Sequence, residues 1–157
     1  MVLHQLYPKL DPGVSDPRDI HADIVLVHGL MGHYINTWKA EDDTVWPSDL
    51  LPEALRKRTD LNKRTELDIQ TELHIRVLSF EYGGSIMGTS SQAGINDAAQ
   101  HLLQCLYDKR EDQRDKSRPI IFVGHSLGGV IIKRAIRLAY NNYRFRSVKK
   151  PISGVVC

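Results

Sequence analysis

The fold is decided by the stretch Ile120-Ile121-Phe122-Val123-Gly124-His125-Ser126-Leu127-Gly128-Gly129 and by the pattern that follows it. The apolar residues 120–123 predict a buried strand, and apolar residues from 127 to 138 recur at helical spacing. Between them lies a Gly-x-Ser-x-Gly turn, which is so tight that its flanking positions must be small. Such a turn lifts the hydroxyl of Ser126 above the end of the sheet. We therefore predict that Ser126 is a nucleophile, with a serine that merely caps a glycine turn as the alternative.

Main-chain amides near Ser126 are candidates for an oxyanion hole, which needs two convergent hydrogen-bond donors. The amide of Leu127 lies at a helix N-terminus, where unpaired N–H groups and the helix dipole favour an anion. The second donor is expected from Gly29 or Leu30, because the loop His28-Gly29-Leu30-Met31-Gly32 directly follows the first strong strand. The turn itself is expected to comprise Gly124, His125, Gly128 and Gly129.

The rest of the chain alternates between strand and helix patterns. The predicted strands are residues 22–28, 73–80, 120–123 and 152–156, with an extended segment at 2–7. The predicted helices are residues 47–57, in which Pro52 is a candidate break, 92–109 and 130–140. This alternation predicts an α/β fold with a parallel sheet and helices on both faces. The loops 29–37, 81–90 and 124–129 should then meet at the carboxyl edge of the sheet.

The chain is long enough for one domain with a real core. We expect residues 1–21 to form an extended leader and residues 22–157 to form the N-terminal part of one domain. Within it, residues 56–72 are expected to be a charged insertion and residues 110–118 a charged loop.

The histidines offer no obvious general base, because none follows Ser126. His125 lies inside the turn, where its side chain should diverge from that of the serine. His28 is expected to order the loop through main-chain contacts, with a role as the catalytic base as the less favoured alternative. His33 and Tyr82 are candidates for the rim of the substrate site, although a tyrosine that covers a loop is the commoner case. No group of histidines has the spacing of metal ligands, so we expect neither a metal nor a cofactor.

Composition is that of a soluble globular protein, with 41% hydrophobic and 25% charged residues. A net charge of +2 does not argue for a nucleic-acid partner. The charge is uneven, however, because residues 127–157 contain seven Lys or Arg and no acid. A basic surface for anionic lipid or nucleic acid is one explanation, and a solvated helix face is the other. Two cysteines predict no disulfide framework, and no apolar stretch has the length of a membrane span.

Several segments together resemble the serine esterase branch of the α/β-hydrolase superfamily. They are residues 22–33, Thr37-Trp38, the Trp-Pro-Ser-Asp-Leu-Leu-Pro run at 46–52, residues 76–82 and the Gly-His-Ser-Leu-Gly-Gly run. The branch includes the serine active site-containing protein 1 family and the hydrolase-like domains of fungal NACHT and ankyrin proteins. It is more distantly similar to the lipase-like inositol deacylases of glycolipid anchors. The resemblance implies a three-layer core and a lipase-like esterase that hydrolyses an ester, such as that of a lipid, through Ser126.

The sequence departs from this family where the catalytic acid and histidine should follow. After Ser126 it runs 31 residues to Cys157 without an Asp, Glu or His, whereas the triad of such enzymes has the order serine, acid, histidine. We therefore expect a fragment that is truncated after the last strand and is linked to downstream domains in a longer protein. The alternatives are a non-catalytic hydrolase-like module of a signalling protein and a truncated product without a stable fold.

We expect the chain to be cytoplasmic, with peripheral attachment to the endoplasmic reticulum or the mitochondrial membrane as the alternative. The expected partner is an ester or lipid-like substrate, without nucleic acid.

Overall fold

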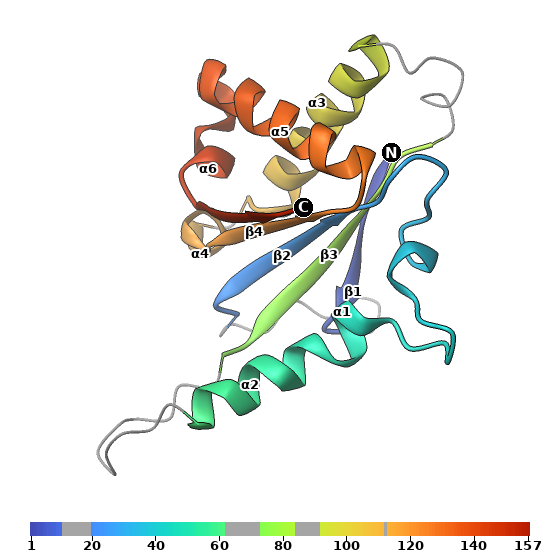
Figure 1. Ribbon diagram of the computed structural model, residues 1–157. Helices are drawn as coiled ribbons and strands as arrows, with labels where there is room; N and C mark the ends of the chain where they lie inside the picture. Colours follow the sequence, from blue (N-terminus) through green and yellow to red (C-terminus); the bar gives the residue numbers. More distant parts are fainter. Residues whose placement is uncertain (11–19, 62–72, 84–91, 112) are drawn as a thin grey trace.

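Four apolar runs and the N-terminal segment form one five-stranded sheet in the computed structural model, which describes residues 1–10, 20–61, 73–83, 92–111 and 113–157 (Figure 1). The strands are β1 (Val2–Tyr7), β2 (Ala22–Val27), β3 (Ile75–Glu81), β4 (Ile120–Gly124) and β5 (Ile152–Val156). Their order across the sheet is β1-β3-β2-β4-β5. The strands from β3 to β5 pair in parallel, whereas β1 pairs with β3 in the antiparallel direction. The predicted α/β class with a mainly parallel sheet is confirmed.

Helices lie on both faces of the sheet (Figure 1). They are α1 (Trp46–Asp49), α2 (Leu51–Leu61), α3 (Gln92–Lys109), α4 (Gln113–Ser117), α5 (Leu127–Asn141) and α6 (Arg146–Lys149), with short 3-10 turns at Asn36–Trp38 and Tyr143–Phe145. Because successive strand residues point to opposite faces, β2 contributes Val25 and Val27 to the core under α3 and α5. It contributes Ile24 and Leu26 to a second core, which Trp38 and Leu55 help to cover.

Some helix boundaries differ from the sequence-based prediction. The helix expected at 47–57, with Pro52 as its candidate break, is instead divided into α1 and α2 at Leu50, and α2 continues to Leu61. The charged stretch 110–118, expected as a loop, contains the short helix α4. The helix after the turn begins at Leu127 rather than near residue 130. Of the expected insertion 56–72, residues 62–72 lie outside the described residues.

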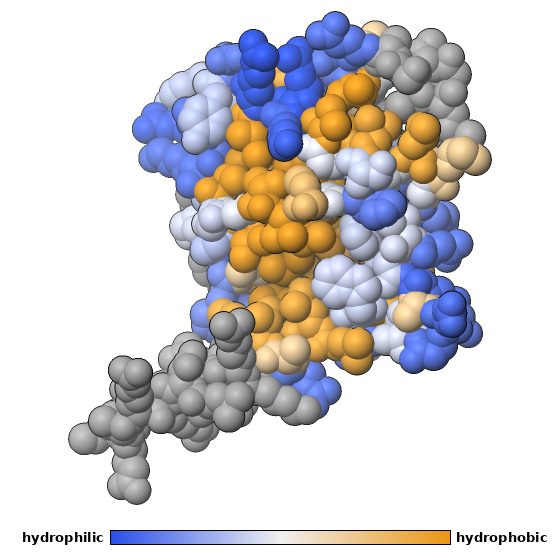
Figure 2. Space-filling view, in the orientation of Figure 1, coloured by the Kyte–Doolittle hydropathy of each residue, from blue (hydrophilic) through white to orange (hydrophobic). Residues whose placement is uncertain are grey.

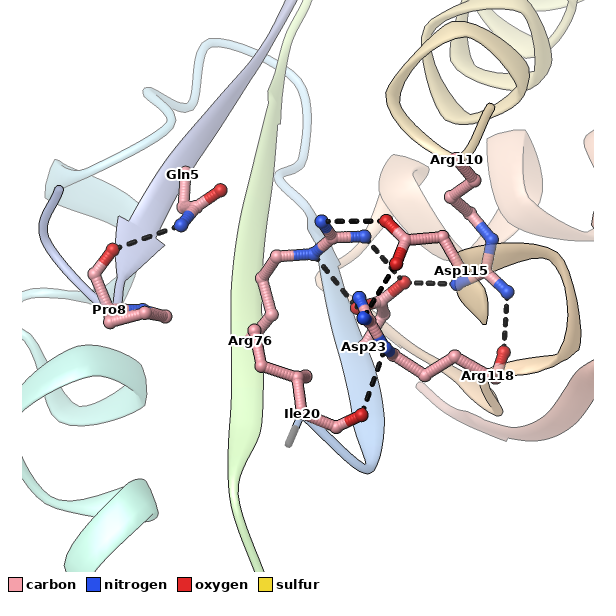
Figure 3. Close-up of polar contacts among 8 residues, drawn as sticks. All are labelled: Gln5, Pro8, Ile20, Asp23, Arg76, Arg110, Asp115 and Arg118. Carbon is pink, nitrogen blue, oxygen red and sulfur yellow. Dashed lines mark hydrogen bonds and ion pairs between the residues drawn. The ribbon is translucent and has the colours of Figure 1, made fainter. Parts of the chain in front are cut away.

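A buried ionic cluster joins the amino-terminal ends of β2 and β3 to the segment before β4 (Figure 3). Asp23 is fully buried, and Arg76 binds it twice, through Nε to Oδ1 at 2.9 Å and Nη2 to Oδ2 at 3.0 Å. Arg110 and Arg118 also bind this carboxylate. Asp115 accepts from Arg76 at 3.2 Å and from Arg118 at 2.6 Å. Three arginines therefore share two carboxylates at the end of the sheet opposite Ser126.

β5 is an edge strand with apolar side chains on its surface. Val155 is 42% exposed and Val156 is 59% exposed. Figure 2 shows apolar surface that continues from this edge onto the beginning of α5, where Val130 is 49% exposed. An unpaired apolar edge of this kind is a template for pairing with another strand. No helix in the described part of the chain is long and apolar enough to cross a membrane.

Candidate active site

Ser126 is the second residue of a two-residue turn, His125-Ser126, between β4 and α5. Its backbone angles, φ 52° and ψ −120°, lie in a region that residues other than glycine rarely adopt. A residue in such a conformation costs of order 1–3 kcal/mol and persists only where the surrounding structure holds it. Here the amide of His125 donates to the carbonyl of Val27 at 3.0 Å, and the amide of Gly129 donates to the carbonyl of Ser126 at 3.0 Å. As a result Ser126 is an exposed residue just beyond the carboxyl end of β4.

The glycines of the turn are required by close packing. A Cβ atom on Gly128 would lie 2.0 Å from the carbonyl oxygen of Val27, and one on Gly124 would lie 2.8 Å from the Cα of Gly129. These contacts bring the start of α5 directly against the end of β2. The Gly-x-Ser-x-Gly spacing is therefore a packing requirement of the strand-to-helix junction, whatever chemistry the serine performs.

The loop after β2 lies against the serine turn. A Cβ on Gly29 would be 2.9 Å from the Cβ of Ser126 and 3.0 Å from the carbonyl oxygen of His125. Leu127 is the first residue of α5, so its amide has no acceptor within the helix. The next loop residues, Leu30 and Met31, are 52% and 79% exposed. Two of the predicted oxyanion candidates, Gly29 and Leu127, thus lie next to the predicted nucleophile, and Leu30 follows in the same loop.

His28 is buried beneath this loop and stacks on Tyr82. The ring centroids lie 4.2 Å apart with the planes 5° from parallel, and His28 is only 3% exposed. Its Nδ1 lies 2.9 Å from the carbonyl oxygen of Gly29, a contact in which a protonated Nδ1 donates. Burial lowers the pKa of His28 below its ordinary value of 6.5. The contact with Gly29 is of the main-chain kind that the sequence led us to expect for His28.

Tyr82 supports the same loop from below. It is 7% exposed, and its hydroxyl donates to the carbonyl oxygen of His28 at 2.6 Å. Burial raises the pKa of Tyr82 to about 12, so the phenol stays protonated and can donate. Of the two roles considered for Tyr82, this contact is that of a loop-packing residue. The next part of the predicted loop, residues 84–90, lies outside the described residues.

Two further histidines belong to the loop after β2 and to the turn: His33, which accepts hydrogen bonds from the main chain, and His125, which is exposed. The Nδ1 atom of His33 accepts from the amides of Ile35 at 3.1 Å and Asn36 at 3.3 Å. His125 is exposed beside Ser126. Among the described residues no hydrogen bond joins the hydroxyl of Ser126 to an imidazole or a carboxylate, and no three metal-binding side chains converge. The site as described holds a positioned serine and adjacent amides, without a general base in contact.

The prediction from sequence did not include two features, one beside this site and one at the opposite end of the sheet. The first is the hydrogen bond from Tyr82 to the carbonyl of His28, for which the sequence carries no local signal. The second is the ionic cluster of Asp23, for which a charged residue inside an otherwise apolar strand was an available signal. An unpaired carboxylate is too costly to bury there, so cationic partners could have been expected.

Comparison with known proteins gives one family match. A family model described as "Putative serine esterase (DUF676)" matches residues 21–157. Protein SERAC1 of Danio rerio is 27% identical over 150 residues, which cover 94% of this chain and 23% of that protein. Protein SERAC1 of Homo sapiens is 24% identical over 168 residues, which cover 94% of this chain and 22% of that protein.

A shorter match joins the chain to a second group. GPI inositol-deacylase of Emericella nidulans is 33% identical over 63 residues, which cover 38% of this chain and 5% of that protein. The chain therefore spans less than a quarter of the length of these relatives. No solved structure matches it.

Proposed function

The chain belongs to the family described as "Putative serine esterase (DUF676)", and on this premise we propose that Ser126 is the nucleophile of a carboxylic ester hydrolase. The oxygen of Ser126 attacks the ester carbonyl, and the carbonyl oxygen becomes an oxyanion. Collapse of this intermediate expels the alcohol with a proton and leaves an acyl-enzyme. Water then attacks the acyl group, releases the carboxylic acid and restores the serine.

The observation that carries the proposal is the conformation of Ser126. A positive φ in a residue other than glycine is costly, and here it occurs in an exposed serine at the close-packed junction of β2, β4 and α5. A cap or a plain turn needs no such strain. We therefore propose that the turn serves to present the hydroxyl of Ser126 as a nucleophile.

The oxyanion is proposed to bind between two main-chain amides. Leu127 supplies one from the first turn of α5, and Gly29 or Leu30 supplies the other from the adjoining loop. The contact between Gly29 and Ser126 supports this pairing. The loss of one donor from such a pair typically raises the barrier by about 2.7–4 kcal/mol, so the rigidity of the loop matters for the rate.

The general base is proposed to come from outside residues 1–157. This part of the proposal rests on two observations: no described histidine binds the hydroxyl of Ser126, and the SERAC1 relatives extend well beyond the matched region. Without a base the serine stays a neutral alcohol. The 157 residues alone should retain at most about 10³–10⁴-fold acceleration over water from the oxyanion hole and binding.

The substrate is proposed to be an ester with an apolar acyl group, in keeping with a role in lipid metabolism. The exposed apolar side chains of Leu30 and Met31 lie in the loop that contacts the serine turn. A relative that matches part of the chain is named GPI inositol-deacylase, a name that states the removal of an acyl group. These points favour a lipid-like ester over a small polar one.

A second candidate function is a hydrolase-like module that binds without turnover. The absence of a base in contact with Ser126 among the described residues favours it. The two functions differ in one measurement, which is the hydrolysis of p-nitrophenyl esters of increasing acyl length by the protein isolated from its natural source. The esterase requires activity that Ser126→Ala abolishes and that Ser153→Ala, at an exposed serine on β5, leaves intact. A purified natural protein with no ester turnover would instead establish the module.

A further inference from the structure

We propose that the hollow between the end of α3, α4 and the segment from Tyr143 to Lys150 binds the phosphate group of an organic phosphate. The hollow has a volume of about 630 Å³. It lies where α4 and α6 are neighbours, at the left of Figure 1. Hydrophilic residues cover the upper part of this side of the molecule in Figure 2.

The lining of the hollow is cationic. It contains four basic side chains and no carboxylate; the basic residues are Lys116, Arg144, Arg146 and Lys150. Among the described residues none of these four forms an ion pair. Asp115, which precedes Lys116 in the sequence, is engaged elsewhere, because its two carboxylate oxygens accept from Arg76 and Arg118. The hollow therefore concentrates positive charge that no acidic side chain of the described residues neutralises.

Aromatic rings hold the two guanidinium groups. The guanidinium carbon of Arg144 lies 5.7 Å from the ring centroid of Tyr107 and 5.8 Å from that of Phe145. That of Arg146 lies 5.6 Å from the ring centroid of Tyr143, whose hydroxyl accepts from its Nη1 at 3.3 Å. A ring attracts a guanidinium without cancelling its charge. The N–H groups at the guanidinium edge stay available for the bidentate contacts that arginine makes with phosphate.

The rings also fit the organic part of the ligand. Tyr107 and Tyr143 both line the hollow, and Tyr143 is 81% exposed. The combination of several cations with aromatic surface favours a phosphate ester over an inorganic anion. The hollow adjoins the C-terminal end of α5 while Ser126 precedes its first residue, so about 21 Å of helix separates them. This ligand is therefore not the ester held at Ser126, and the inference does not depend on esterase activity.

The test is a titration of the 157-residue chain with phenyl phosphate, followed by backbone amide chemical shifts. We expect saturable shifts in residues 143–150 and 116–117, and none with benzyl alcohol, which has the ring without the phosphate. The double variant R144Q/R146Q should weaken binding at least tenfold. The matched control K133Q/R137Q removes the same charge from exposed positions of α5 outside the hollow and should change the affinity less than twofold.

A second arm distinguishes a free phosphate ester from a lipid headgroup. Sedimentation with phosphatidylcholine vesicles that contain phosphatidic acid should show binding that R144Q/R146Q lowers more than K133Q/R137Q if the phosphate is presented by a lipid. Phenyl phosphate binding without vesicle binding would identify a free ester. Either pattern supports the site.

The proposal fails if both double variants weaken binding equally, because the attraction would then be the general charge of this region. It also fails if neither phenyl phosphate nor the vesicles bind, or if only an oligonucleotide does. Should R144Q/R146Q unfold, the double variant K116Q/K150Q serves instead, because these lysines make no ring contacts in the described structure. It must lower the affinity more than K133Q/R137Q does.

Discussion

The hydroxyl of Tyr82 donates a 2.6 Å hydrogen bond to the main-chain carbonyl oxygen of His28, at the point where β2 passes into the loop beside Ser126. The same two residues stack through their rings. Because both are buried, the carbonyl has no access to water in place of the phenol. This contact ties the predicted oxyanion loop to the end of β3.

Replacement of Tyr82 by Phe should therefore lower the free energy of unfolding by about 1–3 kcal/mol, the cost of a buried carbonyl left without a donor. Urea denaturation of the 157-residue chain measures it. Tyr140→Phe is the matched control, since Tyr140 is 62% exposed, and should be close to neutral. Equal effects of the two substitutions would show that the hydroxyl of Tyr82 does not support the loop.

Asp23 should be among the most costly side chains to neutralise. Asp23→Asn leaves Arg76, Arg110 and Arg118 facing an uncharged amide in a buried site. The loss of one partner from a buried ionic cluster typically destabilises by about 3–5 kcal/mol. Thermal denaturation should show a large loss of stability, and Asp43→Asn, at an exposed residue, should show little change. Similar melting temperatures for wild type and Asp23→Asn would refute the role given to the cluster.

The start of α5 should not accept a side chain at Gly128. Gly128→Ala places a Cβ 2.0 Å from the carbonyl oxygen of Val27, and the obstacle is backbone. The helix start must move away from β2, so we expect strong destabilisation and displacement of Ser126. In Gly154→Ala the new Cβ meets Ile121 at 3.7 Å, an ordinary contact. Circular dichroism and denaturation should separate these variants clearly, and a normal Gly128→Ala protein would contradict the packing described.

Stability should decrease as the pH falls below about 6.5 because of His28. Burial lowers the pKa of this histidine in the folded protein below 6.5, its ordinary value in an unfolded chain. Between the two pKa values the unfolded state binds more protons than the folded state. The free energy of unfolding therefore decreases as the pH is lowered from 6.5 to the pKa of the folded protein. His28→Asn should reduce this slope, measured by urea denaturation at a series of pH values from 7.5 to about 4.5. If the slope is unchanged in His28→Asn but absent in His101→Asn, at an exposed position, the dependence of stability on pH does not arise from His28.

The serine turn was predictable because its constraints are local. Gly124, Ser126 and Gly128 are close in sequence, and their spacing follows from one strand-to-helix junction. The approach of Gly29 to Ser126 followed from the rule that parallel strands present their carboxyl ends at one edge. That step needed only the order of strands and helices.

Other features depend on contacts that no local pattern encodes. Asp23 meets Arg76 across 53 residues and Arg118 across 95, and the sequence shows only isolated charges. The antiparallel pairing of β1 with β3 depends on register between distant segments. The roles proposed for Ser126, Leu127, Gly29 and Leu30 stay predictions, as does the division at residue 21.

The most direct test of the central claim is the site of reaction with a fluorophosphonate, a reagent that phosphonylates activated serines. The protein from its natural source should be labelled rapidly, and peptide mass spectrometry should place the label on Ser126. The isolated 157-residue chain should react slowly, because the described structure holds no base against this hydroxyl. A natural protein that stays unlabelled, or that carries the label on another serine, would contradict the account.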